Sequence, residues 1–194
     1  MGRPHYTNRN SKPILEKEYK ILKSYINGLD TFKTTKIKWL RSVELLYLSG
    51  LRVSELLDIK IKDIMNGINK GELSVYVKKQ KIIRHIPLSK KSISTLKKLI
   101  ENETDTESYF IHKRNGGRNN LNHIGFTKDF NQLIQLVLGK EFSTHSFRKG
   151  LITEFSQKGI NPKITQTFIG HKNITTTLNY YNPTVKDIRK CLIR

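Results

Sequence analysis

Hydrophobic positions in the first part of the chain follow helical spacing. Pro13 can open a helix, because its fixed φ suits the first helical turn. The first apolar stripe consists of Ile14, Leu15, Ile21, Leu22, Tyr25 and Ile26 and ends at Gly28. A second stripe consists of Ile37, Leu40, Val43, Leu45, Leu46 and Tyr47 and ends at Ser49 and Gly50. A short third stripe, Leu56, Leu57 and Ile59, follows Ser54 and Glu55. The first 65 residues are therefore predicted to be helical.

From Glu72 onward the apolar residues follow a two-residue rhythm instead. They are Leu73, Val75, Val77, Ile82, Ile83 and Ile86, and Lys78, Lys79, Gln80 and Lys81 lie between the two groups. Such alternation around a polar turn predicts a β-hairpin with a basic tip. Ser89 is placed to cap a helix that reaches Ile100, and residues 109–111 are predicted to add a third strand before the Asn- and Gly-rich loop 113–120.

The rest of the chain is predicted to be helical. Helices are expected over 121–138, 144–158, 162–168 and 174–181, and Pro183 precedes a last amphipathic segment, 185–193. That segment either packs on its own core or docks on a neighbouring protomer. The predicted fold class is mainly α with a small antiparallel β-sheet (α+β). We expect a polar, basic leader over residues 1–12 and one domain over 13–194, because the chain contains no repeat and no long linker.

Composition narrows the possible partners. The chain has 194 residues, with 36 Lys and Arg against 16 Asp and Glu, which gives a formal net charge of +20. This surplus predicts a polyanionic partner, such as nucleic acid. No apolar run approaches the roughly 18 residues of a membrane span, and the polar start does not resemble a signal peptide. The single cysteine, Cys191, and six scattered histidines make a metal site an unfavoured interpretation.

A few residues could carry chemistry, although each has an ordinary explanation on its own. Arg52 at a helix start and Lys79 at a hairpin tip are usually solvated charges. His145 and Arg148 share one helix face at an i,i+3 spacing, which is common on surfaces. His171 follows Gly170 where a helix is expected to end, and Tyr180 and Tyr181 would ordinarily be buried aromatics.

The order and spacing of these residues carry more information than any one of them. The chain contains SGLRVSEL (49–56), the hairpin with Lys79 followed by RHIPL (84–88), HSFR (145–148), IGHK (169–172), and then Tyr180 nine residues after His171. This series resembles the tyrosine recombinase (phage integrase) family over roughly residues 14–194. The resemblance implies the DNA breaking-rejoining fold of a tyrosine recombinase catalytic domain, in the short layout of the fimbrial-switch invertases, without a separate N-terminal core-binding domain.

The same resemblance implies a catalytic set around one phosphate. Its members are Arg52, Lys79, His145, Arg148 and His171, with Tyr180 as the nucleophile. Tyr181 remains a second choice for the nucleophile, and Lys78 and Lys81 remain alternatives to Lys79.

Physical chemistry assigns a role to each member of the set. Two arginines can present planar forks to the charged oxygens of a five-coordinate phosphorus. Tyrosine, with an ordinary pKa of about 10, needs a base, for which His145 is the candidate. His171 is expected to hydrogen-bond the phosphate, and Lys79 is expected to protonate the leaving 5′-oxygen. This chemistry requires no metal and no nucleotide cofactor.

The resulting hypothesis is a site-specific DNA recombinase that acts through a covalent 3′-phosphotyrosyl intermediate. The alternatives are a type IB topoisomerase-like nicking-closing enzyme and a non-catalytic DNA-binding protein with a helix-turn-helix over 164–181; an RNA-binding role fits the charge but none of the motifs. The expected partner is double-stranded DNA. The chain is expected to be a monomer in solution and a homo-tetramer when synapsed on DNA, with no membrane association. The expected location is cytoplasmic or nucleoid-associated, or an organelle if an AT-rich organelle genome encodes the chain.

Overall fold

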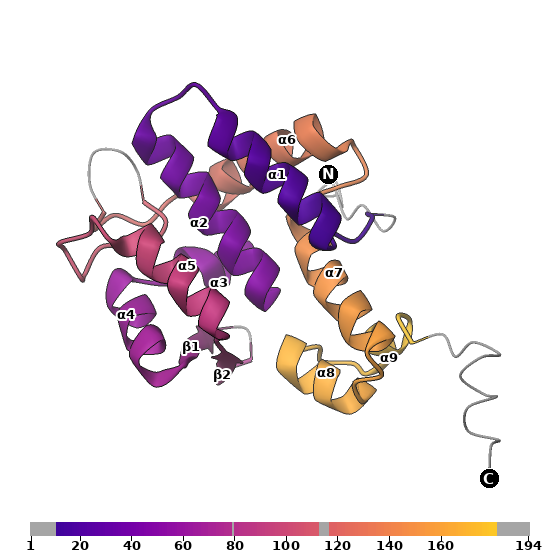
Figure 1. The fold of residues 1–194 in the computed structure, drawn as a ribbon. Helices are drawn as coiled ribbons and strands as arrows, with labels where there is room; N and C mark the ends of the chain where they lie inside the picture. The colour runs from indigo at the N-terminus through magenta and orange to yellow at the C-terminus, as the bar shows by residue number, and fades with distance from the viewer. Residues whose placement is uncertain (1–10, 79, 113–116, 182–194) are drawn as a thin grey trace, which may run out of the picture. The chain divides into compact units, whose positions relative to one another are not determined.

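The computed structural model describes residues 11–78, 80–112 and 117–181 (Figure 1). The chain divides into two compact units, Met1–Leu151 and Ile152–Arg194, and the boundary falls within one helix. We describe each unit by itself. The prediction that residues 13–194 form one domain stays a prediction.

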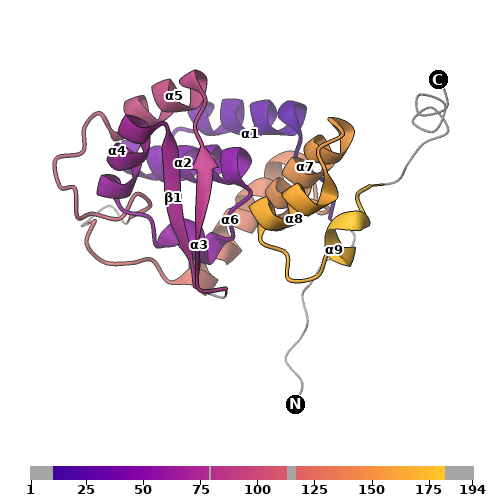
Figure 2. The same ribbon diagram turned by 90° about the horizontal axis from the view of Figure 1, so that it is seen from below.

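The first unit begins with a layer of helices. In chain order they are α1 (Glu16–Gly28), α2 (Lys33–Ser49), α3 (Val53–Leu57) and α4 (Ile61–Lys70). α1 lies beside α2 (Figures 1 and 2) and buries Leu22 and Ile26 completely. The prediction that the first 65 residues are helical covers α1, α2 and α3 but ends within α4. Its sequence, IKDIMNGINK, buries only Ile61, Ile64 and Gly67 and mixes Asn and Gly with the apolar residues, which weakens the helical signal.

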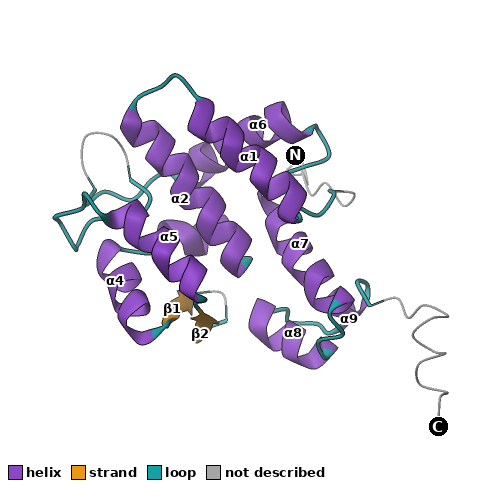
Figure 3. Ribbon diagram, in the orientation of Figure 1, coloured by secondary structure: helices purple, strands orange, loops and turns teal. Residues whose placement is uncertain are grey.

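A two-stranded antiparallel sheet follows these helices. β1 (Glu72–Val77) pairs with β2 (Ile82–Pro87), with Leu73 opposite Ile86 and Val75 opposite Arg84. The unit then continues through α5 (Lys90–Ile100), α6 (His123–Leu138) and α7 (Thr144–Gln157). Helices dominate the described part of the chain, with the hairpin as its small sheet (Figure 3). The predicted α+β class is therefore confirmed.

The predicted third strand over residues 109–111 is wrong. Tyr109 makes one isolated antiparallel bridge with Lys60, and the backbone N–H of Phe110 donates to the carbonyl oxygen of Ile59 at 2.8 Å. This segment therefore bonds to the loop before α4 and not to the hairpin. Phe110 and Ile111 are fully buried, so their apolar character reflects burial and not strand pairing.

The alternation within β2 also differs from the prediction. Ile82 and Ile83 are exposed, whereas Arg84 and Ile86 face the core. The inward register is set by Leu73, Val75 and Val77 of β1, all of which are buried. Because a strand shows its side chains to opposite faces in turn, this pairing places Arg84 inside.

Aromatic side chains join α2, α6 and α7 in the core of the first unit. Trp39 stacks on Phe130 with ring centroids 5.2 Å apart, and Phe130 stacks on Phe147 at 6.3 Å. Phe126 completes the group beside Trp39. This core holds α7 in place, and α7 carries His145 and Arg148.

The second unit contains the last turns of α7 with α8 (Pro162–Ile169) and α9 (Thr175–Leu178). Phe155 packs against Phe168 with ring centroids 5.5 Å apart. The helix predicted over 174–181 is shorter than expected, because α9 ends at Leu178 and a turn follows it. The predicted helix over 185–193 lies outside the described residues. No described helix combines the length and the apolar character that a membrane crossing requires.

The segment before α1 passes close to α7 at Gly150. A Cβ atom added to Gly150 would lie 1.9 Å from the carbonyl oxygen of Ile14, and the N–H of Ile14 donates to the carbonyl of Ser146 at 2.9 Å. We expect Gly150→Ala to lower the free energy of unfolding by about 1–3 kcal/mol, the usual range for overpacking, because the clash is with backbone. Chemical denaturation measures this change.

Gly125→Ala in α6 is the matched control. Its nearest contact lies at 3.8 Å, so added helix propensity is expected to leave stability unchanged or slightly raised. Equal stability of Gly150→Ala and the unmodified protein would contradict the prediction.

Candidate functional site

The turn between α2 and α3 is fixed by its own backbone and by two arginines. Gly50 has φ 58°, the left-handed conformation that glycine adopts without strain, and its N–H donates to the carbonyl of Leu46 at 2.9 Å. The carbonyl of Ser49 accepts a hydrogen bond from Arg84, and the carbonyl of Gly50 accepts one from Nη1 of Arg148 at 3.1 Å. The turn is thus held where Arg52 begins α3.

Arg52 is oriented by a carboxylate one turn further along the chain. Glu55, 5% exposed, accepts from the backbone N–H of Arg52 at 2.9 Å and from Nη1 of the same residue at 2.6 Å. Sequence reasoning did not assign Glu55 to the site. The three-residue step from Arg52 to Glu55 at a helix start is the capping-box spacing, and that signal was available.

His145 and Arg148 lie one turn apart on α7, as their spacing predicted. Arg148 is 7% exposed and contacts the turn, whereas His145 is exposed. His145 and Arg52 both line a pocket of about 260 Å³. The residues that line it are Leu51, Arg52, Val53, Ser54, His123, Thr127, Thr144 and His145. The structure therefore brings together Arg52, His145 and Arg148, three of the residues that the sequence singled out.

The surroundings of His145 favour its neutral form. Although His145 is exposed, the residues around it partly desolvate its imidazole, which lowers its pKa below the ordinary value. The positive charges of Arg148, Arg52 and Lys149 lower this pKa further. A neutral imidazole can accept a proton, whereas an imidazolium cannot. His145 is therefore suited to act as a base near neutral pH.

This arrangement predicts how His145 titrates. In the unmodified protein, its imidazole should gain a proton only below the ordinary histidine pKa of about 6.5. Lys149→Met removes one of the charges that lower this pKa, so the midpoint should move upward, toward the ordinary value. NMR titration of the histidine ring protons measures both midpoints. A midpoint above the ordinary value in the unmodified protein would contradict the prediction.

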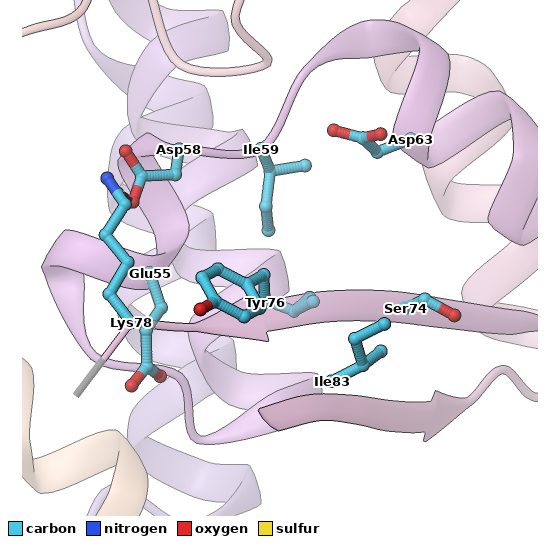
Figure 4. Close-up of a pocket in the computed structure, with 9 residues that line it drawn as sticks. Glu55, Asp58, Ile59, Asp63, Ser74, Tyr76, Lys78 and Ile83 are labelled. Atoms are coloured by element: carbon cyan, nitrogen blue, oxygen red, sulfur yellow. Dashed lines mark ion pairs between the residues drawn. The ribbon is translucent and has the colours of Figure 1, made fainter. Parts of the chain in front are cut away.

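The hairpin tip is described only in part. Lys79 lies outside the described residues. Its neighbour Lys78 is paired with Asp58 at 2.8 Å on a separate pocket of about 260 Å³, which is lined by Glu55, Asp58, Asp63, Tyr76 and Ile83 among others (Figure 4). The Asp58 carboxylate raises the pKa of Lys78, the opposite of what a general acid needs. Lys81 is exposed in the turn. The ion pair with Asp58 therefore makes Lys78 a poor candidate for the general acid.

The second unit holds His171 and the tyrosine pair. Gly170 ends α8 with φ 73°, and Nδ1 of His171 lies 2.9 Å from the hydroxyl of buried Thr177. This hydrogen bond fixes the orientation of the ring. The two tyrosines differ in their contacts. The hydroxyl of Tyr181 lies 2.5 Å from that of buried Thr165, whereas the backbone carbonyl of Tyr180 accepts from Ser156 at 2.6 Å. The Tyr181 hydroxyl thus packs against Thr165. The assignment of the nucleophile to Tyr180 stays a prediction from the nine-residue step after His171.

No cluster of three or more His, Cys, Asp or Glu side chains suited to a metal ion occurs in the part of the chain that the structure describes. The first-unit site is instead built from cations. Two arginines, a neutral histidine and a single orienting carboxylate define a site for an anionic group with several oxygens, such as a phosphate.

Comparison with known proteins identifies the family. The model of the phage integrase family matches residues 13–186. Tyrosine recombinase XerA of Pyrococcus furiosus is 29% identical over 184 residues, which cover 94% of this chain and 61% of XerA. Tyrosine recombinase XerD of Staphylococcus saprophyticus is 30% identical over 173 residues, which cover 84% of this chain and 57% of XerD. This chain belongs to the phage integrase family, as the sequence motifs predicted.

Solved structures confirm the fold. The Tn1549 transposon integrase in complex with a circular intermediate DNA matches 94% of this chain and 65% of that chain, with a TM-score of 0.74 and 22% identity. The fold is therefore that of a tyrosine recombinase catalytic domain. The chain spans less than two thirds of the length of the XerA and XerD relatives.

Proposed function

We propose that this protein is a tyrosine-type site-specific DNA recombinase that cuts and rejoins strands through a 3′-phosphotyrosyl intermediate. One observation carries the proposal. Arg52 and His145 line the same pocket of the first unit, and Arg148 donates to the carbonyl of Gly50 in the turn that leads to Arg52. Family membership and the relatives named tyrosine recombinases support it.

The arginines would stabilise the charge that develops on the phosphate. Attack on a phosphodiester places negative charge on the equatorial oxygens of a five-coordinate phosphorus, and preorganised donors there lower the barrier. Arg52 is held by Glu55 and Arg148 by the turn, so neither guanidinium needs to reorganise when the substrate binds. Both remain charged near neutral pH.

Protons and bonds balance in the proposed step. The Tyr180 oxygen bonds to phosphorus while its proton passes to neutral His145, and the bond from phosphorus to the 5′-oxygen breaks. The 5′-oxygen leaves as a hydroxyl with a proton from Lys79, and His171 hydrogen-bonds the phosphate. Resealing is the reverse of this step, with the 5′-hydroxyl as the nucleophile, so no external energy source is needed.

The proposed partner is double-stranded DNA, as expected from the net charge of +20 and from the relatives whose structures contain DNA. We further propose a homo-tetramer on two duplexes, and a location with the DNA of a bacterium, phage, plasmid or organelle. A nicking-closing enzyme of the topoisomerase type shares the single-strand chemistry but needs only one protomer. A purely DNA-binding helix-turn-helix protein would not need a buried arginine beside a neutral histidine.

Covalent capture tests the proposal. The protein is incubated with a pool of duplexes that carry a nick beside a randomised segment, so that the cut fragment diffuses away and traps the covalent intermediate. A band that survives denaturation, contains both protein and DNA, and is lost on protease treatment is the expected result. Sequencing the trapped DNA then supplies the target site. Tight DNA binding without any trapped adduct would reject the enzyme and leave the DNA-binding alternative.

A further inference from the structure

Arg84 is a buried cation that the proposed chemistry does not use. It lies in β2 between exposed Ile83 and exposed His85, and its side chain faces the core with 4% exposure. Burying a guanidinium is costly unless hydrogen bonds and charges around it compensate. An apolar side chain would fill this inward position at less cost, so the cation at this position requires an explanation beyond packing.

The hydrogen bond of Arg84 points to that explanation. Its Nη2 donates to the carbonyl of Ser49, the last residue of α2. No basic residue lies in the last turn of α2, so Arg84 supplies, from a strand, the cation that a helix C-terminus favours. The bond joins residues 35 positions apart in the chain.

Two consecutive carbonyls of the turn are therefore held by two different arginines. Ser49 accepts from Arg84, and Gly50 accepts from Arg148 at 3.1 Å. Two residues later the chain reaches Arg52, whose backbone N–H is fixed by Glu55. Only a few backbone dihedral angles separate Ser49 from Arg52. The position of the Ser49 carbonyl therefore restricts the position of the Arg52 Cα atom, from which its side chain extends.

The electrostatics agree with this geometry. Burial lowers the pKa of Arg84 to about 10, while the nearby Glu55 charge raises it and the nearby Arg52 charge lowers it. Arg84 thus remains a cation at neutral pH. It is close enough to Arg52 and Glu55 for both charges to change its pKa. Arg84 and Arg148 thus donate to the carbonyls of Ser49 and Gly50, while Glu55 of α3 accepts from Arg52 at the end of the same turn.

We propose that Arg84 is a positioning residue of the phosphate site, which acts through the Ser49–Arg52 turn and does not touch the phosphate. This inference rests on the proposed function. The same residue ties the strand that follows Lys79 in the chain to the turn that carries Arg52. Arg84 therefore links the segment proposed to protonate the leaving oxygen to the segment proposed to hold the phosphate.

The test compares cleavage and binding in Arg84→Met and Arg84→Lys, on the nicked duplex recovered from covalent capture. We expect Arg84→Met to slow single-turnover cleavage by about 10- to 100-fold, because a small misplacement of a catalytic group costs up to about 100-fold. The dissociation constant for the same duplex should change less than about threefold, because most of the affinity comes from other cations. Arg84→Lys, which keeps the charge and one donor, should recover part of the rate.

Arg41→Met is the matched control. Arg41 is 2% exposed and donates to the carbonyls of Leu99 and Phe110, so it too is a buried arginine that binds backbone, but away from the turn. Its loss should lower the melting temperature and leave the cleavage rate of the folded protein near that of the unmodified protein. Equal cleavage rates for Arg41→Met and Arg84→Met, measured where both are folded, would overturn the proposal.

A double-mutant cycle shows whether Arg84 acts through Arg52. If it does, adding Arg84→Met to Arg52→Lys should slow cleavage by much less than it slows the unmodified protein. Strictly multiplicative effects would overturn the proposal. Should Arg84→Met not fold, the cycle is run with Arg84→Lys. Absence of an adduct with the unmodified protein rejects the proposed function, whereas adduct formation at an unchanged rate in the Arg84 variants rejects only this inference.

Discussion

Tyr180→Phe is expected to abolish the covalent protein–DNA adduct while leaving DNA affinity within about threefold of the unmodified protein. Phenylalanine keeps the ring but removes the oxygen that would bond to phosphorus, and loss of a nucleophile removes most of the rate enhancement, here by at least about 10⁴-fold. The adduct is measured on denaturing gels with the nicked duplex, and the affinity on the same duplex by fluorescence anisotropy.

Tyr181→Phe is the paired control for this experiment. The Tyr181 hydroxyl lies against Thr165, so its loss should cost about 0.5–1.5 kcal/mol of stability and leave adduct formation intact. The reverse pattern, with an adduct from Tyr180→Phe and none from Tyr181→Phe, would assign the nucleophile to Tyr181. The reason for expecting otherwise is the nine-residue step from His171 to Tyr180.

Arg148→Lys should slow cleavage by about 100- to 1,000-fold, the usual loss when one donor to a developing oxyanion is removed. Lysine keeps the charge but lacks the planar fork, so it cannot hold the Gly50 carbonyl and two phosphate oxygens together. Arg148→Ala should be slower still. It should also unfold more easily, by about 1–3 kcal/mol, because the Gly50 carbonyl loses a buried donor.

Single-turnover cleavage at pH 8 and thermal unfolding separate these two effects. Lys149→Met is the neighbouring control, since it removes one positive charge from α7 without removing the donor to Gly50. At this pH His145 is neutral in both proteins, so the control should cleave within about threefold of the unmodified rate. Full activity of Arg148→Lys would show that Arg148 serves the fold alone.

Much of this molecule could be predicted from sequence because its helices are amphipathic. Several of its site residues could also be found from short sequence patterns within one helix. The i,i+3 spacing of His145 and Arg148 was enough to predict that they share a helix face. The position of Arg52 at a helix start was likewise predictable from the nearby sequence. The role of Tyr180 needed the family resemblance, and the structure added only the contact between the Tyr181 hydroxyl and Thr165.

The features that were missed depend on contacts distant in sequence or on burial. Residues 109–111 look like a strand because they are buried and apolar, yet their backbone partners lie in a loop. In β2, residue type indicated Ile82 and Ile83 for the core, whereas pairing with β1 turned Arg84 inward. Glu55 was visible as a helix-start residue, but only its two bonds to Arg52 show what it orients.

The ion pair between Lys78 and Asp58 affects how the salt sensitivity of DNA binding should be interpreted. Each cation that neutralises a phosphate displaces a condensed counterion, and the slope of log affinity against log salt counts these displacements. A lysine that stays with its own carboxylate displaces none. If Lys78 stays paired with Asp58 when DNA binds, a salt slope calculated from the number of lysines at the hairpin tip will be too steep by the contribution of Lys78.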